Sequence, residues 1–219
     1  MRNIDPLHLR PLAVLLCLSL SLVALSPLAA AESNPSAKEA ASSAATPVRV
    51  LVAYHSLRGN TEQMAQAVAE GARRVAGTEV SLKKVTEVTK EDLVAADGIV
   101  LGCPTYYANI PGQMKVAIDD WSWKMDVDFT DKVGGAFATG GGQTGGKEHV
   151  VTSLLLFLLN VRMIVAGPLY QDEEGDDIWA EMGASAATGP TDPGVSESER
   201  DAARRLGERV ATVARKLRS

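Results

Sequence analysis

The stretch that most constrains the fold is Val48–Ala65, in which a strand pattern runs directly into a helix pattern. Its first seven residues, Val48–Tyr54, form a nearly continuous apolar run, which is typical of a strand covered on both faces. The loop Ser56–Thr61 follows, and helical spacing begins at Asn60, which we expect to be the N-cap. Such a loop gathers backbone N–H groups at the positive end of a helix dipole. The segment therefore predicts an anion site, most often one for phosphate.

Strand and helix patterns alternate over the rest of the chain. Further strands are predicted at Thr78–Lys84, Gly98–Cys103, Val133–Thr139 and Met163–Ala166. Helices are predicted from Asn60 to about Gly77, at Lys90–Ala95, from about Pro111, over Val150–Leu159, and from the capping box Ser196-x-x-Glu199 to the end. This alternation indicates an α/β fold: a doubly wound, five-stranded parallel sheet of order 2-1-3-4-5 in a single domain.

The helix patterns also predict which side chains face the core. These positions are Met64, Val68, Ala72 and Val75 in the first helix, Met114, Ile118 and Trp121 in the middle of the chain, and Ala203, Leu206, Val210, Val213 and Leu217 in the last helix. Between the fifth strand and the last helix, Leu169–Gly194 shows no period, and we expect a long irregular segment. Its acidic run, Asp172–Asp177, suggests a solvated loop, with a lid that includes Trp179 as the alternative.

The first 31 residues carry the features of a secretory signal peptide. Arg2 and Arg10 give a positive start, and Pro11–Leu25 is an apolar stretch without charge. Ala29–Ala31 then supplies the small residues of a cleavage site. We therefore expect export, to the periplasm. An uncleaved membrane anchor over residues 11–31 is the alternative, since that uncharged length could just span a bilayer.

The remaining chain divides into two parts. Residues 32–47, rich in Ala and Ser, are predicted to be a flexible linker, and residues 48–219 are long enough for one domain. The formal charge of −5 becomes −6 after cleavage, because Arg2, Asp5 and Arg10 together carry +1. A mildly acidic chain argues against a nucleic-acid partner.

The glycine-dense loop Gly140–Gly146 narrows the kind of phosphate that is expected. With Lys147 it has the spacing of a P-loop, but Glu148 stands where that motif needs Ser or Thr to hold Mg²⁺. The loop Ser56–Thr61 also lacks the glycine pattern of dinucleotide-binding folds, and Arg58 is the only cation in it. The two loops therefore favour a terminal monophosphate over a triphosphate. A capped turn without ligand is the alternative for the first loop.

The loop after the third strand supplies aromatic side chains. Tyr106 and Tyr107, beside the polar Thr105 and Asn109, are of the kind that stack on a planar ring and hydrogen-bond to it. Ordinary surface tyrosines are the alternative. The loops after the first, third and fourth strands would open at the same edge of a parallel sheet, where such folds bind ligands. They predict one site for a planar, phosphate-bearing cofactor.

These segments resemble flavodoxin-like FMN proteins, and most of all the NAD(P)H:quinone oxidoreductases of the tryptophan-repressor-binding-protein type. The resemblance rests on Ser56–Thr61, Pro104–Lys115 and Ala138–Gly142, and it spans about Val48–Ser219. It implies FMN as cofactor, NAD(P)H as electron donor and a quinone or similar small molecule as acceptor. The implied cofactor-binding residues are Ser56, Leu57, Arg58, Gly59, Asn60 and Thr61 at the phosphate, Pro104, Thr105, Tyr106, Tyr107, Ala108 and Asn109 at the isoalloxazine edge, and Thr139, Gly140, Gly141 and Gly142 at its flank.

The resemblance places the chemistry on the flavin, so no side chain is assigned an essential catalytic role. His55 and Tyr106 are the candidates to approach the reacting atoms, with His55 as a proton donor to reduced quinone. A plain hydrogen-bonded histidine is the alternative. No metal is expected, because neither His55 nor His149 has further ligands at metal-binding spacing. The alternative functions are a flavodoxin-type one-electron carrier and a non-catalytic FMN-binding module.

Two further tryptophans bear on assembly. The resemblance implies an aromatic wall contributed by a neighbouring subunit, which Trp121 or Trp123 could supply if the chain forms a homo-oligomer. Cys103, within a predicted strand, is expected to be a core residue rather than a reactive thiol.

Overall fold

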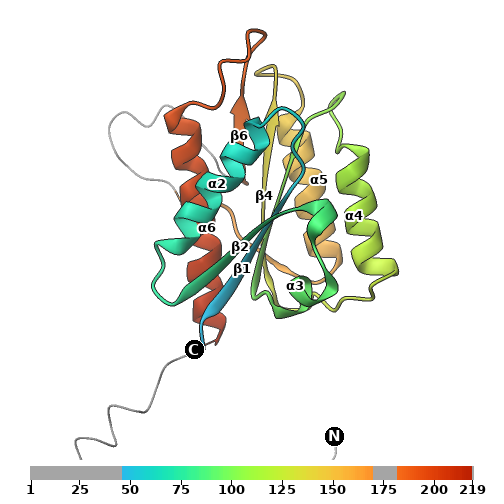
Figure 1. The fold of residues 1–219 in the computed structure, drawn as a ribbon, viewed down its shortest axis with the longest axis vertical. Coiled ribbons are helices and arrows are strands. Elements are labelled where there is room, and N and C mark those ends of the chain that lie inside the picture. The colour runs from blue at the N-terminus through green and yellow to red at the C-terminus, as the bar shows by residue number, and fades with distance from the viewer. Residues whose placement is uncertain (1–45, 170–181, 219) are drawn as a thin grey trace, which may run out of the picture. The chain divides into compact units, whose positions relative to one another are not determined.

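A parallel β-sheet forms the middle layer of the domain in the computed structural model, which describes residues 46–169 and 182–218 (Figure 1). The strands are β1 (Val48–Tyr54), β2 (Thr78–Lys84), β3 (Gly98–Pro104), β4 (Val133–Gly140), β5 (Ile164–Val165) and β6 (Ala184–Ala187). Their order is β2-β1-β3-β4-β5, with β6 also paired to β4, and every pair is parallel. The predicted doubly wound α/β fold is thus confirmed.

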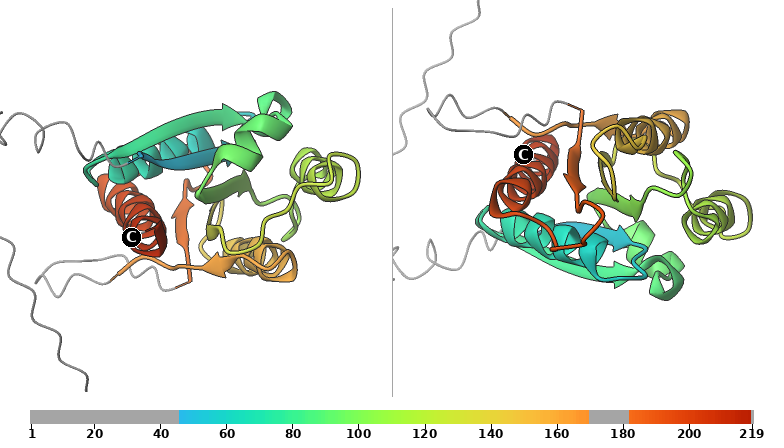
Figure 2. Two further views of the ribbon diagram at one scale, coloured as in Figure 1. Left: turned by 90° about the horizontal axis from the view of Figure 1, so that it is seen from below. Right: turned by 90° about the horizontal axis from the view of Figure 1, so that it is seen from above.

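Helices cover both faces of the sheet (Figure 2). They are α2 (Asn60–Arg73), the 3₁₀-helix η1 (Val85–Glu87), α3 (Lys90–Ala95), α4 (Gly112–Trp123), α5 (Lys147–Asn160) and α6 (Glu197–Arg218). The apolar residues of α2 and α6 share one core cluster with the sheet, and those of α3, α4 and α5 share the other. None of the helices in the described ranges is long and apolar enough to cross a bilayer.

The predicted core positions are buried or partly buried, with one exception. Leu217 is 54% exposed, so its assignment to the core is wrong. The reason is that Ala214 is the last buried residue of α6, and the final turn of the helix runs past the core.

The edge of the sheet beside β4 is built from two short strands instead of one. β5 pairs with Val133 and Gly134, whereas β6 pairs with the other end of the same strand, Phe137–Gly140. The prediction that Leu169–Gly194 is irregular throughout is therefore wrong at β6. The predicted acidic loop at residues 172–177 and Trp179 lie outside the described residues.

The small side chains of β6 explain both its position and why it was missed. Ala184 and Ala186 are fully buried in the core cluster that α6 shares with the sheet. Gly183, just before them, lies so close to β4 that a Cβ there would be 2.2 Å from the carbonyl oxygen of Ala136. Alanine is disfavoured in strands in general, so the run Ala-Ser-Ala-Ala carries no strand pattern.

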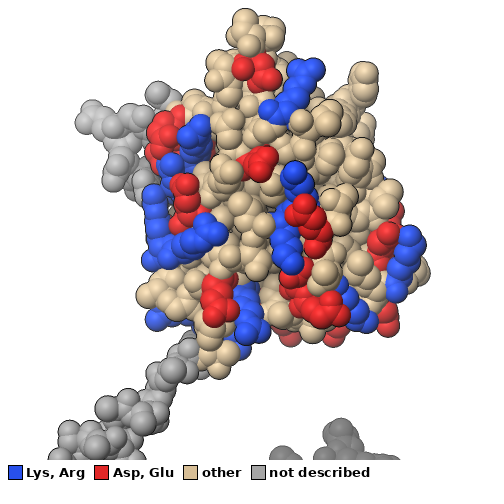
Figure 3. Space-filling model, viewed as in Figure 1, with Lys and Arg blue, Asp and Glu red and all other residues tan. Residues whose placement is uncertain are grey.

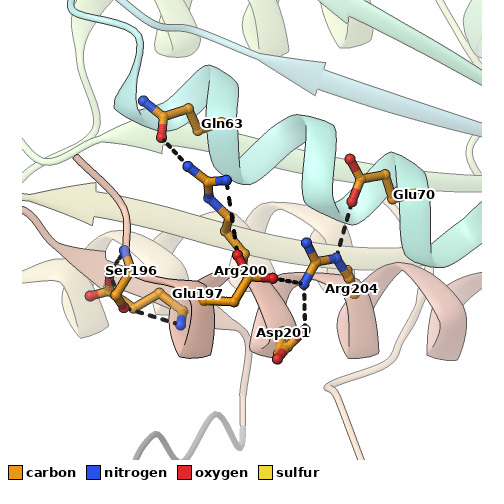
Figure 4. A network of polar contacts seen from close by, with 8 residues as sticks. Gln63, Glu70, Ser196, Glu197, Arg200, Asp201 and Arg204 are labelled. Carbon is orange, nitrogen blue, oxygen red and sulfur yellow. Dashed lines mark hydrogen bonds and ion pairs between the residues drawn. The ribbon is translucent and has the colours of Figure 1, made fainter.

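Helices α2 and α6 cross with their backbones in direct contact. A Cβ on Gly71 would lie 1.8 Å from the carbonyl oxygen of Arg204, and one on Gly207 would lie 1.9 Å from that of Val68. Polar pairs run along the same crossing, as Figure 4 shows: Arg204 bonds to Glu70 at 3.0 Å, and further contacts join the first turns of the two helices. The two helices therefore hold each other at a fixed distance.

Candidate functional site

A cavity of about 320 Å³ opens at the carboxyl edge of the sheet, among the loops at the upper end of Figure 1. All three loops that the sequence singled out line it, and the segment after β6 lines it as well. The lining residues are Ser56, Leu57, Arg58, Asn60, Thr61, Pro104, Thr105, Tyr106, Thr139, Gly140, Gly141, Thr188, Gly189, Pro190 and Asp192. The topology thus brings the predicted loops together, as the parallel sheet requires.

Five of the predicted binding residues do not line this cavity: Gly59, Tyr107, Ala108, Asn109 and Gly142. Tyr107 is wholly exposed. It lies with Ala108 in a turn of positive φ, which backbone bonds of 3.0 and 3.1 Å between Tyr106 and Asn109 close. The turn packs on the glycine loop, because a Cβ at Gly146 would meet that of Ala108 at 2.6 Å. The turn therefore lies against the loop after β4, and only its first residue, Tyr106, lines the cavity.

The loop after β1 differs from the expectation at its helix cap. Gly59, with φ of 95°, occupies the N-cap position, and Asn60 is the first residue of α2, so the assignment of Asn60 as N-cap is wrong. Glycine adopts this left-handed conformation without strain, which frees the Asn60 side chain for another partner. Its Nδ2 donates to Oδ1 of Asp192 at 2.6 Å. The first N–H groups of a helix have no partner within the helix, and here they belong to residues that line the cavity.

Hydroxyl groups form the floor of the cavity. The Oγ1 atoms of Thr61 and Thr139 lie 2.8 Å apart, and both side chains are buried. The Oγ1 atom of Thr105 is also buried but has no hydrogen-bond partner in the structure. Since buried hydroxyls rarely lack a partner, this atom fits a ligand oxygen or nitrogen in the cavity. The residues present therefore suit a phosphorylated, hydroxyl-rich cofactor.

The charges around the cavity favour a monophosphate over a triphosphate. Lys147, which completes the P-loop spacing, is only 3% exposed and donates to the carbonyl oxygens of Gly142 and Gln143 at 3.0 and 2.9 Å. Its ammonium group holds the glycine loop in place and is not free for a ligand. Within residues 46–169 and 182–218, Arg58 and Asp192 are the charged residues that line the cavity. One cation and neutral donors suit a monophosphate.

Of the two candidate catalytic side chains, Tyr106 lines the cavity and His55 does not. Tyr106 lines the cavity and is 37% exposed, so it can contact a planar ring. His55 is half-buried, and burial lowers the pKa of its imidazole, but it does not line the cavity. His149 is exposed on the first turn of α5. Burial raises the pKa of the Cys103 thiol to about 12, which fits a core residue.

Of the two tryptophans considered for a wall from a second subunit, Trp121 is buried in the core and unavailable. Trp123 is 86% exposed on the same helix, α4.

The segment Thr188–Asp192 is the part of the cavity that the sequence did not reveal. Its glycine and proline residues read as an ordinary loop, and the residues before it show no strand pattern. Only the pairing of β6 with β4 brings it to the carboxyl edge of the sheet, beside Gly140. The capping box at Ser196 could have indicated this segment. It marks the start of a helix, and a loop that leads into a helix start is a candidate wall of an anion site.

Comparison with known proteins gives the family of the chain. A family model described as NADPH-dependent FMN reductase matches residues 46–174. A flavodoxin of Aquifex aeolicus is 41% identical over 163 residues, which are 74% of this chain and 85% of the relative. A protein named NAD(P)H dehydrogenase (quinone), from Acidithiobacillus ferrooxidans, is 34% identical over 77% of this chain and 98% of its own length.

Solved structures agree with this comparison. A flavodoxin, WrbA-like protein from Agrobacterium tumefaciens superposes with a TM-score of 0.60 at 28% identity, over 77% of this chain and 98% of that one. An archaeal flavodoxin has the same TM-score at 20% identity, over 77% and 99%, and shows the fold alone. The flavodoxin-like architecture predicted from the sequence is confirmed.

Proposed function

The chain belongs to the NADPH-dependent FMN reductase family, and we propose that it is an FMN-dependent NAD(P)H:quinone oxidoreductase. The resemblance noted in the sequence is thereby confirmed. Relatives from Acidithiobacillus ferrooxidans and Geotalea uraniireducens, at 34% and 33% identity, are named NAD(P)H dehydrogenase (quinone) and are covered over 98% and 99% of their lengths. Their activity supports a two-electron reductase as the function of this chain.

The observation that carries the proposal is the meeting of phosphate-type and ring-type groups in one cavity. The start of α2, with Thr61 and Arg58, would hold the phosphate of FMN through N–H groups, a hydroxyl and one positive charge. Thr105 would give its unpartnered hydroxyl to the cofactor, and Tyr106 would contact the ring. When bound, FMN would supply the redox chemistry by which NAD(P)H reduces a quinone with two electrons.

The protein's own part in this reaction is to bind and orient. Thr61 and Thr139 form the buried floor of the cavity, and the glycine loop lets the backbone approach a flat ring closely. Lys147 fixes that loop from inside.

A one-electron carrier is the second candidate, because one relative, at 41% identity, is named a flavodoxin. A carrier that docks on a protein partner is expected to surround its flavin with acidic groups. Among the described residues that line the cavity, Asp192 is the single carboxylate and Arg58 offsets it. Figure 3 shows few charged side chains at the upper end of the face it displays, where the loops lie. This distribution favours a small neutral acceptor.

Export and assembly extend the proposal. The signal-peptide pattern at residues 1–31 and the linker pattern at residues 32–47 support a periplasmic domain, or one tethered through residues 11–31, that acquires FMN after export. The exposure of Trp123 supports a homo-oligomer in which this side chain reaches a second subunit. Cell fractionation would test the first point, and light scattering of the wild type against Trp123→Ala would test the second.

Steady-state kinetics test the proposed activity. The purified full-length chain, reconstituted with FMN, is assayed with NADH or NADPH and benzoquinone at several fixed concentrations of each. If NAD(P)H and the quinone react with the bound flavin one after the other, as we propose, the kinetics will follow a ping-pong pattern of parallel double-reciprocal lines. An FMN-loaded protein that does not oxidise either nicotinamide would point to the electron carrier instead. A chain that binds no FMN would refute both.

A further inference from the structure

One buried carboxylate outside the lining of the cavity is tied to it through the backbone. Glu199, in the first turn of α6, is only 7% exposed. Its Oε2 accepts hydrogen bonds from the backbone N–H and the Oγ of Ser196, both at 2.8 Å, and Ser196 Oγ accepts the Glu199 N–H at 3.3 Å. This is the predicted capping box, which is confirmed.

The other oxygen of the same carboxylate reaches beyond the helix. Glu199 Oε1 accepts the backbone N–H of Ala187, the last residue of β6, at 2.7 Å. A capping box needs only the contacts within the helix start, so the bond to Ala187 is an addition. One carboxylate therefore joins the end of an edge strand to the start of a helix.

The two anchors of Glu199 enclose the loop Thr188–Val195. Four residues of that loop line the cavity: Thr188, Gly189, Pro190 and Asp192. Two further bonds hold the loop in addition to those of Glu199. Thr188 N–H donates to the carbonyl oxygen of Gly140 on β4 at 2.9 Å, and Asn60 of α2 donates to Asp192. Without the carboxylate, the N–H groups of Ala187 and Ser196 would lose a charge-assisted partner at both ends of the loop together.

We propose that Glu199 is a positioning residue for the cofactor pocket, which holds the loop Thr188–Val195 in place as a wall of the FMN site. The identity of the ligand rests on the proposed function, whereas the effect on the loop does not. A purely structural capping role would stabilise α6 but leave the cavity wall and the affinity for FMN unchanged.

The test compares Glu199→Ala and Glu199→Gln with a matched control, Asp92→Ala. Asp92 is the carboxylate of the capping box of α3, where it accepts the N–H of Thr89 at 2.8 Å, and α3 contributes nothing to the cavity lining. Three quantities are measured on the full-length apoprotein. They are the unfolding temperature, by circular dichroism, and, below that temperature, the Kd for FMN, by fluorescence titration, and the hydrogen–deuterium exchange of residues 188–195.

We expect Glu199→Ala to raise the Kd for FMN by about tenfold or more, as the loss of charge-assisted bonds at both anchors implies, and to speed exchange in the loop. Glu199→Gln should lie between it and the wild type, because an amide carbonyl still accepts one of the N–H groups. Asp92→Ala should lower only the unfolding temperature. If Glu199→Ala does not fold, the Kd for FMN and the loop exchange of Glu199→Gln decide whether Glu199 positions the loop.

The inference is overturned if both Glu199 variants lower the unfolding temperature as Asp92→Ala does, with wild-type exchange in residues 188–195 and wild-type affinity for FMN. If the wild type itself binds no FMN, the proposed function fails. Exchange in the loop then still decides on the role of Glu199.

Discussion

The crossing of α2 and α6 allows a sharp prediction about Gly71. A methyl group at this position would lie 1.8 Å from the carbonyl oxygen of Arg204, where ordinary van der Waals contact begins at 3.4 Å. The obstacle is backbone, so the helices must separate by about 1.6 Å or bend. Forcing extra volume into a packed contact costs about 1–3 kcal/mol, and the better helix propensity of alanine offsets at most about 1 kcal/mol. We expect Gly71→Ala to lower the free energy of unfolding by about 1–2 kcal/mol.

Urea denaturation of the apoprotein, followed by circular dichroism, measures this loss. Gly112→Ala is the matched control, because a Cβ on this first residue of α4 meets no atom within 4 Å. The control should be as stable as the wild type or slightly more stable. A Gly71→Ala variant that matched the control would refute the direct backbone contact. Because α2 begins at the cavity and α6 follows its loop, the Gly71 variant should also bind FMN more weakly.

The remaining predictions concern the cavity and the core. Asn60→Ala combined with Thr61→Ala should weaken FMN binding by about 1–3 kcal/mol, because the Thr61 hydroxyl is lost at the phosphate and the bond from Asn60 to Asp192 is lost at the cavity wall; an unchanged Kd would mean that the phosphate lies elsewhere. Asp192→Asn should strengthen FMN binding by on the order of 1 kcal/mol, since it removes a negative charge from the phosphate end; weaker binding in a titration would show that its charge serves the site. Burial raises the pKa of the Cys103 thiol to about 12 in the folded state, whereas its pKa in the unfolded chain is 9.0. Unfolding therefore releases a proton in this range, and the free energy of unfolding should fall between pH 9 and pH 12, with a shallower fall in Cys103→Ala as measured by urea denaturation at each pH.

The parts of the fold that local patterns encode were predictable. Val48–Tyr54 is apolar on both faces because α2 covers one side of the strand and the cluster around α3 and α4 covers the other. The convergence of the three loops followed from the parallel order of the strands alone. The capping box at Ser196 was also predictable, because it depends on two residues that lie three apart in the chain.

The parts that failed depend on contacts between distant segments. β6 exists because alanine and glycine fit against β4, and no local pattern encodes such a fit. The cap at Asn60 failed because Gly59 accepts a positive φ and Asp192, far along the chain, takes the asparagine side chain. The loop Thr188–Val195 was missed as a wall for the same reason, since Glu199 binds Ala187 across it.

The most direct test of the proposed function is an anaerobic titration that follows the visible absorbance of the flavin. The FMN-loaded protein is first mixed with one equivalent of NADH or NADPH, and one equivalent of benzoquinone is then added. A two-electron quinone reductase should lose the absorbance of oxidised flavin in the first step and recover it fully in the second. Flavin that keeps its absorbance in the presence of both nicotinamides would contradict the assignment.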